Sequence, residues 1–99
     1  MRSKYHLAAV FANNFLNHQI GMLQEYCSLS GIDPSFFDSM VQKSISNAIS
    51  SKAYDIQTGP AHRGDQVTLK RHLEMLPERM QGIYKTISSS IAEIKMREN

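Results

Sequence analysis

The sequence predicts an all-α domain of four helices. Apolar residues recur at spacings of three and four over long stretches, which is the pattern of amphipathic helices. Helix start and stop signals separate these stretches, and no segment shows the alternation of apolar and polar residues that marks a strand. The chain has 99 residues and a net charge of +2, so we treat residues 1–99 as a single domain.

The first predicted helix runs from about Ser3 to Ser30 and is apolar over more than half of its circumference. A helix of this kind is buried on more than one side. In a domain this small, we therefore expect the long helix either to be central or to pack against another chain. Gly31 follows it as the glycine that commonly ends a helix. Cys27 lies in the apolar stretch, and we interpret it as a core residue and not as a nucleophile.

Local signals also bound the other three helices. The second helix should start with Asp33 as its N-cap and Pro34 as its first helical residue. It should end near Ser51. Asp65 should cap a short third helix, which Pro77 interrupts before starting the fourth. The fourth helix carries an apolar stripe that indicates either core or the seam for a partner helix, formed by Met80, Ile83, Tyr84, Ile87, Ile91 and Ile94.

The segment before the third helix, Thr58 to Asp65, has the most specific pattern in the chain. Its glycines and proline favour a fixed shape that a flexible linker would lack, and it holds the permanent cation Arg63. One interpretation is a functional loop that presents Arg63 to a ligand. The other is a structural turn in which Asp65 caps the next helix and Arg63 pairs locally.

Polar residues interrupt the apolar first helix. Asn14 and His18 are four residues apart and share one face, and His6 lies two turns before Asn14, near the same side. Gly21 leaves room for a close approach on that face. Because polar groups on a buried helix need partners, these residues either hydrogen-bond another helix or form the polar wall of a cleft.

Composition argues against several function classes. Charges of both signs interleave and no basic stripe carries aromatic residues, so we expect neither nucleic acid nor a membrane surface as partner. No apolar run reaches the ~18 residues of a membrane span, no signal peptide is evident, and a single cysteine fits the reducing cytoplasm. No glycine-rich phosphate loop follows a strand, so we expect no cofactor site in this chain. The histidines lack metal-ligand spacing, so we expect no metal site at His6, His18, His62 or His72.

Two motifs together resemble a known bacterial family. They are His6 to Phe15 (HLAAVFANNF) with Asn17-His18, and Thr58 to Asp65 (TGPAHRGD) followed by His72-Leu73. Both are similar, in order and separation, to domain of unknown function 2520, a helical domain that follows a Rossmann-like NADP-binding domain in oxidoreductases. The resemblance extends from His6 to about Ile94.

This resemblance implies the fold of the C-terminal helical domains of 6-phosphogluconate dehydrogenase-like enzymes, which dimerise and close over the substrate beside the nicotinamide. We therefore expect a homodimer, a Rossmann domain in a longer parent protein, NADP or NAD as the parent's cofactor, and a small-molecule substrate. Since the Rossmann half is absent, this chain would be the C-terminal substrate and dimerisation domain and would not be an enzyme alone.

The resemblance also implies roles for individual residues. Asn14 and His18 would be catalytic, by hydrogen-bonding the reacting oxygen. The substrate-binding residues would be His6, Thr58, Gly59, Pro60, Arg63 and Asp65.

An alternative of a different class is a free-standing helical module that binds a partner helix in an apolar groove. The apolar first helix and the six methionines support it, because methionine suits adaptable surfaces.

Overall fold

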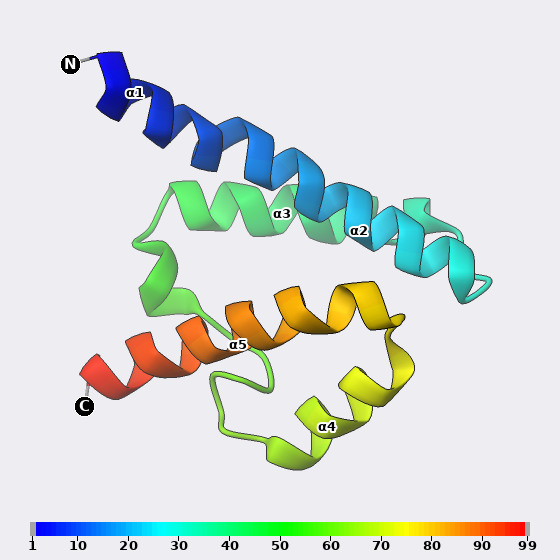
Figure 1. Cartoon of the computed structure of the whole chain (residues 1–99). Coiled ribbons are helices and arrows are strands. Elements are labelled where there is room, and N and C mark those ends of the chain that lie inside the picture. Colours follow the sequence, from blue (N-terminus) through cyan, green and yellow to red (C-terminus); the bar gives the residue numbers. More distant parts are fainter. Residues whose placement is uncertain (1, 99) are drawn as a thin grey trace. The chain divides into compact units, whose positions relative to one another are not determined.

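The computed structural model describes residues 2–98 and is all-α over that range, with no strand (Figure 1). Met1 and Asn99, the outermost residues of the predicted domain, lie outside the described residues. The predicted four-helix organisation is confirmed, with the first helix divided into three segments and short turns added between helices. The elements in order are α1 (Arg2–Ala9), η1 (Val10–Phe15), α2 (Leu16–Leu29), η2 (Pro34–Phe37), α3 (Asp38–Ile49), η3 (Ala53–Ile56), α4 (Gln66–Met75) and α5 (Glu78–Glu98).

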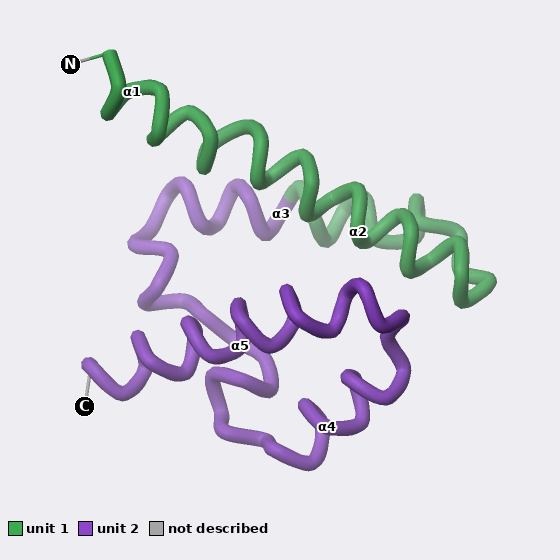
Figure 2. Tube along the Cα trace, in the orientation of Figure 1, with its two compact units in different colours: residues 1–42 green, residues 43–99 purple. Residues whose placement is uncertain are grey.

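The chain forms two compact units, which divide between Gln42 and Lys43 within α3 (Figure 2). The first unit contains the long N-terminal helix, η2 and the start of α3. The second contains the rest of α3, η3, the Thr58–Asp65 loop, α4 and α5.

The N-terminal helix is continuous from Arg2 to Leu29, but its middle is not α-helical. Val10–Phe15 is a π-helix, in which each N–H bonds to the carbonyl five residues back. The segment therefore takes up about one residue more than an α-helix would, which corresponds to a rotation of about 100°. The apolar periodicity, which predicted a helix over this segment, does not reveal this change.

Hydrogen bonds at the end of α2 and the start of the next helix confirm the predicted local signals. Gly31 has a φ of 71°, and the N–H of Ile32 donates to the carbonyl of Cys27 at 2.8 Å, as in a Schellman helix end. Asp33 accepts from the N–H of Ser35 at 3.0 Å. The helix that it starts begins with a 3₁₀ turn before α3 continues.

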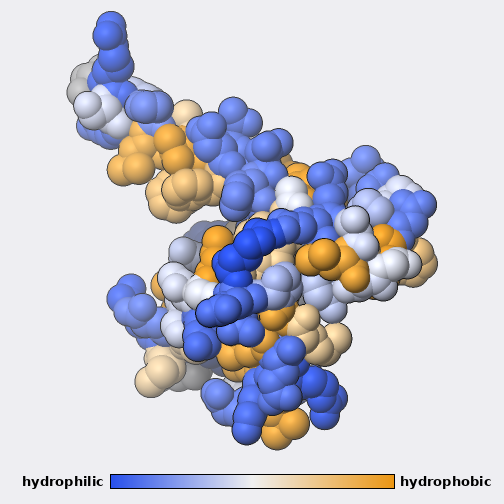
Figure 3. All heavy atoms as spheres, turned by 45° about the vertical axis from the view of Figure 1, so that its right-hand side comes forward, coloured by the Kyte–Doolittle hydropathy of each residue, from blue (hydrophilic) through white to orange (hydrophobic). Residues whose placement is uncertain are grey.

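Burial in the first unit centres on Cys27, which is 1% exposed, so its interpretation as a core residue is confirmed. The rest of the long helix is far less buried than its composition led us to expect. Leu7, Phe11 and Phe15 are 60%, 64% and 55% exposed. Figure 3 shows apolar atoms at the surface along this helix.

The core of the second unit includes Met80, at the start of α5, and Ala61, in the Thr58–Asp65 loop. On α4, Leu69 and Leu73 are half-buried, and so is Leu76, which directly follows the helix. The apolar stripe of α5 is buried at Met80 but partly exposed further along, at Ile83 and Ile87. Of the six stripe residues, only Ile83 and Ile87 are exposed enough to contact a partner.

Candidate functional site

The Thr58–Asp65 loop is a helical turn with a defined end. The N–H of Gly64 donates to the carbonyl of Ala61 at 3.3 Å, and the N–H of Asp65 donates to the carbonyl of Pro60 at 2.9 Å. This pair of bonds is the Schellman motif, which places its penultimate residue in the left-handed region. Gly64 has a φ of 70° and meets that requirement. The fixed shape predicted for the loop is therefore confirmed.

The beginning of the turn is equally well defined. The N–H of Arg63 donates to the carbonyl of Gly59 at 3.2 Å, which closes one turn of helix. Gly59 has a φ of 106°, where other residues are strained. The carbonyl of Thr58 accepts from the side-chain amide of Gln57 at 3.0 Å. Thr58, Gly59 and Pro60 thus contribute backbone shape to the loop.

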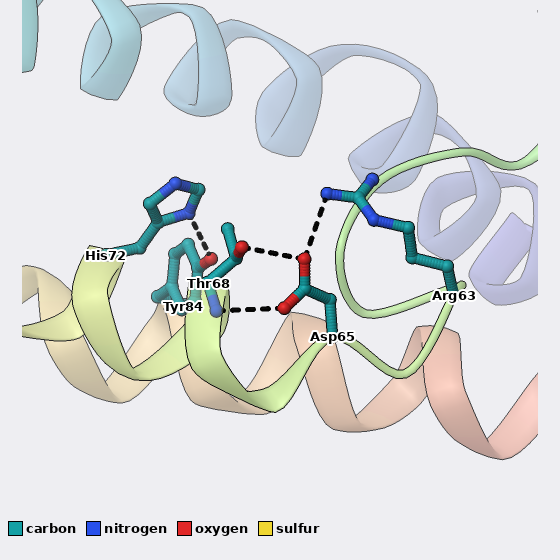
Figure 4. Close-up of polar contacts among 5 residues, drawn as sticks. All are labelled: Arg63, Asp65, Thr68, His72 and Tyr84. Atoms are coloured by element: carbon teal, nitrogen blue, oxygen red, sulfur yellow. Dashed lines mark hydrogen bonds and ion pairs between the residues drawn. The ribbon is translucent and has the colours of Figure 1, made fainter.

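Asp65 caps α4, as the sequence predicts (Figure 4). Its carboxylate accepts from the backbone N–H of Thr68 at 3.0 Å and from the Thr68 hydroxyl at 2.7 Å. The Thr68 hydroxyl is the main cause that holds the pKa of Asp65 below its ordinary value, and the Thr68 N–H and Arg63 lower it further. The folded protein therefore favours the ionised form of this carboxylate.

Arg63 pairs locally with Asp65, since its Nη2 atom lies 3.3 Å from Oδ2 of that carboxylate. This geometry matches the structural-turn interpretation of the loop. The Arg63 side chain is nevertheless 58% exposed, and the ion pair uses one of the five N–H donors of the guanidinium. Arg63 can therefore still present donors to an anion.

The π-helix changes the positions of the polar residues on the long helix. In an uninterrupted α-helix, the eight steps from His6 to Asn14 would leave the two side chains about 80° apart. Because η1 takes up about one extra residue, that separation falls to about 20°. His18 follows Asn14 by four residues. His6, Asn14 and His18 therefore form one row on the helix, and all three are exposed.

This polar row belongs to the first compact unit, and the Thr58–Asp65 loop belongs to the second. His6, Asn14 and His18 are therefore in one unit, and Thr58, Gly59, Pro60, Arg63 and Asp65 are in the other. π-Helical segments are frequent at functional sites, which gives Asn14 a structural context that the sequence did not supply.

A pair that the sequence analysis missed links α4 to α5. His72 Nδ1 lies 2.7 Å from the hydroxyl oxygen of Tyr84, and the two rings meet edge to face with centroids 5.9 Å apart (Figure 4). Burial raises the pKa of Tyr84. We had assigned Tyr84 only to an apolar stripe. No local spacing indicates a bond across twelve residues and a helix break.

The second unit also contains a hollow of about 250 Å³ between the loop, α4 and α5. Its lining residues are Ala61, Gly64, Gln66, Leu69, Leu73, Tyr84, Lys85, Ser88, Ser89 and Ala92.

Two further findings concern the described part of the chain. Within residues 2–98, no group of three or more His, Cys, Asp or Glu side chains is arranged to hold a metal ion. None of the helices in this range is both long and apolar enough to cross a membrane.

Comparison with known proteins identifies the chain as a helical domain of NADP oxidoreductase-like proteins. The model of the family "Domain of unknown function (DUF2520)" matches residues 1–91, and the chain belongs to that family. None of the curated proteins is similar enough to count as a match.

A solved structure supports the same assignment. A protein from Bacteroides fragilis, described as a "putative NADP oxidoreductase", matches 93% of this chain with a TM-score of 0.86 and 32% sequence identity. The present chain spans 36% of the length of that protein. The likeness confirms the predicted all-α, oxidoreductase C-terminal-like fold.

Replacing Asp65 by Ala should lower the melting temperature by several degrees, because α4 loses its N-cap. Asp55→Ala removes the same charge from η3 and is the matched control, for which we expect a smaller change. The lowered pKa of Asp65 means that its stabilisation is present above about pH 4, the range of a free carboxyl, and is lost as pH falls through the folded-state value. The difference between wild type and Asp65→Ala should therefore shrink in acid. Equal melting temperatures at pH 7 would contradict the capping role.

Replacing Arg63 by Ala should leave the melting temperature nearly unchanged, since an exposed ion pair contributes little to stability. Thermal unfolding of Arg63→Ala and Asp65→Ala under the same conditions tests this expectation. A loss for Arg63→Ala as large as that for Asp65→Ala would identify a structural arginine and argue against a binding role.

Proposed function

We propose that this chain is the substrate-side and dimerisation domain of a larger NAD(P)-dependent oxidoreductase and is not catalytic alone. The observation that carries the proposal is the structural likeness, in which nearly all of this chain corresponds to about a third of a protein described as an NADP oxidoreductase. In this proposal, a Rossmann domain outside the chain holds NADP or NAD, and the working protein is cytoplasmic. The free, buried Cys27 is consistent with a reducing compartment.

The roles of the cofactor and of this chain differ in the proposed reaction. Hydride transfer is the chemistry of the nicotinamide, and the protein contributes positioning and electrostatics. Asn14 and His18 hydrogen-bond the reacting oxygen of the substrate, where preorganised donors stabilise developing charge. His6 extends their row by two turns. The alignment of the three exposed side chains by η1 supports this assignment.

Arg63 has the complementary role of holding an anionic group of the substrate. Its guanidinium can bind a carboxylate or a phosphate through two parallel hydrogen bonds. The ion pair with Asp65 restricts the side chain, and the turn formed by Thr58, Gly59 and Pro60 sets the position of its backbone. A preorganised arginine loses less conformational entropy on binding.

Exposed apolar side chains support dimerisation. Phe11 and Phe15 pack edge to face, with ring centroids 5.2 Å apart, and both are more than half exposed. Leu7 extends the same surface. A contiguous apolar surface of this kind marks an interaction site. The same surface would also serve the alternative function, a free-standing helical module, if its partner were a different protein.

We expect a homodimer, with twice the 11.2 kDa mass of the chain, in light scattering at micromolar concentration. Phe11→Glu combined with Phe15→Glu should give a monomer, because charge would have to be buried at the interface. Met96→Glu combined with Met75→Glu places the same two charges on other exposed apolar residues and is the control, which should stay dimeric. A monomeric wild-type chain would contradict dimerisation and favour the module with a different partner.

The isolated chain should not bind NADPH with useful affinity. Dinucleotides bind at a glycine-rich turn between a strand and a helix, with the pyrophosphate at the helix N-terminus. Residues 2–98 contain no strand, and at α4 the Asp65 carboxylate already occupies the N–H of Thr68. Calorimetric titration of NADPH at physiological salt decides the point. Saturable binding in the low micromolar range would show that this domain carries part of the cofactor site.

A further inference from the structure

The hollow between the Thr58–Asp65 loop, α4 and α5 exists because small residues face it. Five of its ten lining residues are glycine, alanine or serine, namely Ala61, Gly64, Ser88, Ser89 and Ala92. On α5 the small residues are spaced three and four apart, so they form one face of the helix. Larger side chains at these positions would fill the space between α4 and α5. A volume of about 250 Å³ is well above the ~30 Å³ share of one water molecule and close to the lower limit for small-molecule pockets.

The walls of the hollow differ in chemistry. Leu69 and Leu73, four residues apart on α4, provide an apolar wall. On the α5 side the lining includes Lys85, whose flexible side chain can bring its ammonium group to an anion, and the hydroxyl-bearing Ser88 and Ser89; Lys85 and Ser89 are exposed. No Asp or Glu is among the lining residues, so no carboxylate in the wall offsets the charge of Lys85.

Tyr84 adds a polar group whose position is fixed. Its hydroxyl oxygen is held 2.7 Å from Nδ1 of His72, and the edge-to-face ring contact restrains the phenol further. A side chain held in this way contributes hydrogen bonding to a ligand with little loss of rotamer entropy.

We propose that this hollow binds a small organic carboxylate with an apolar body. Lys85 and the neighbouring hydroxyls receive the carboxylate, because charge-assisted hydrogen bonds from an ammonium group are among the strongest available. Leu69 and Leu73 contact the apolar body. This site lies beyond the proposed oxidoreductase function, since it requires no nicotinamide and uses neither Arg63 nor the long helix.

Benzoate is a suitable probe, because it joins one carboxylate to an apolar ring of matching size. Titrated into the 99-residue chain and followed by amide NMR shifts, it should bind with a Kd of about 1 mM or tighter, with saturable shifts at residues 61–73 and 84–92. Benzyl alcohol, which lacks the charge, and inorganic phosphate, which lacks the apolar body, should each bind at least about 10-fold more weakly, a difference of about 1.4 kcal/mol.

Two variants test the two walls separately. Lys85→Met keeps most of the side-chain length and removes the charge, so benzoate should bind no better than benzyl alcohol. Ser88→Leu fills the hollow and should abolish binding of both. Lys70→Met removes an exposed lysine of α4 outside the lining and should bind benzoate as wild type does.

Circular dichroism checks that each variant folds. If Ser88→Leu fails to fold, the comparison of Lys85→Met with Lys70→Met still shows whether Lys85 receives the carboxylate. The proposal is overturned if benzoate gives no saturable shifts around the hollow, as when a second copy of the chain covers it in solution. It is also overturned if Lys85→Met binds benzoate like wild type. Neither result bears on NADPH binding, so the carboxylate-site proposal can fail while the oxidoreductase proposal stands.

Discussion

The left-handed conformation of Gly64 is the constraint on which the second unit depends most. It allows the N–H of Asp65 to reach the carbonyl of Pro60 and so ends the helical turn of the loop. With the chain reversed at that point, the Asp65 carboxylate meets the free N–H groups of α4, and Ala61 on the inner side of the turn is buried. A residue with a Cβ would be strained at this φ, although nothing lies within 4 Å of the position that the Cβ would take. The requirement for glycine is therefore conformational and does not arise from packing.

Polar side chains join α4 to α5 near the connection between the two helices. The side-chain amide of Gln81 donates to the carbonyls of Leu73 and Leu76 at 2.9 and 3.3 Å, at the helix end where carbonyls lack their full set of α-helical partners. The carbonyl of Leu73 also accepts from the N–H of Leu76 at 3.4 Å. The bond between His72 and Tyr84 is a second link. Because these bonds set the separation of the two helices near their connection, small residues further along α5 can leave a hollow without the helices collapsing onto each other.

The elements that the sequence predicted well are those that depend on neighbours in the chain. The helix end at Gly31 and the caps at Asp33 and Asp65 involve bonds across two to five residues, and all three are confirmed. The bond between His72 and Tyr84 and the hollow depend on residues brought together from two helices, so no spacing in the sequence reveals them. Phe11 is apolar but 64% exposed, because a hydrophobic pattern shows which residues favour burial and does not show which part of the chain packs against them. The catalytic roles of Asn14 and His18 and the binding roles of His6, Thr58, Gly59, Pro60, Arg63 and Asp65 stay predictions.

The π-helix connects the two functions that we propose for the long helix. Phe15 follows Asn14 directly, so their side chains point about 100° apart, while His18 follows Phe15 by three residues and lies about 60° from it. In a uniform α-helix, His6 would be about 80° away from Asn14. The extra residue in Val10–Phe15 brings His6 back into line with Asn14 and His18. Since 100° per residue does not by itself keep residues 6, 14 and 18 in one row, the π segment is the local distortion that aligns this polar row beside the apolar side chains of Phe11 and Phe15.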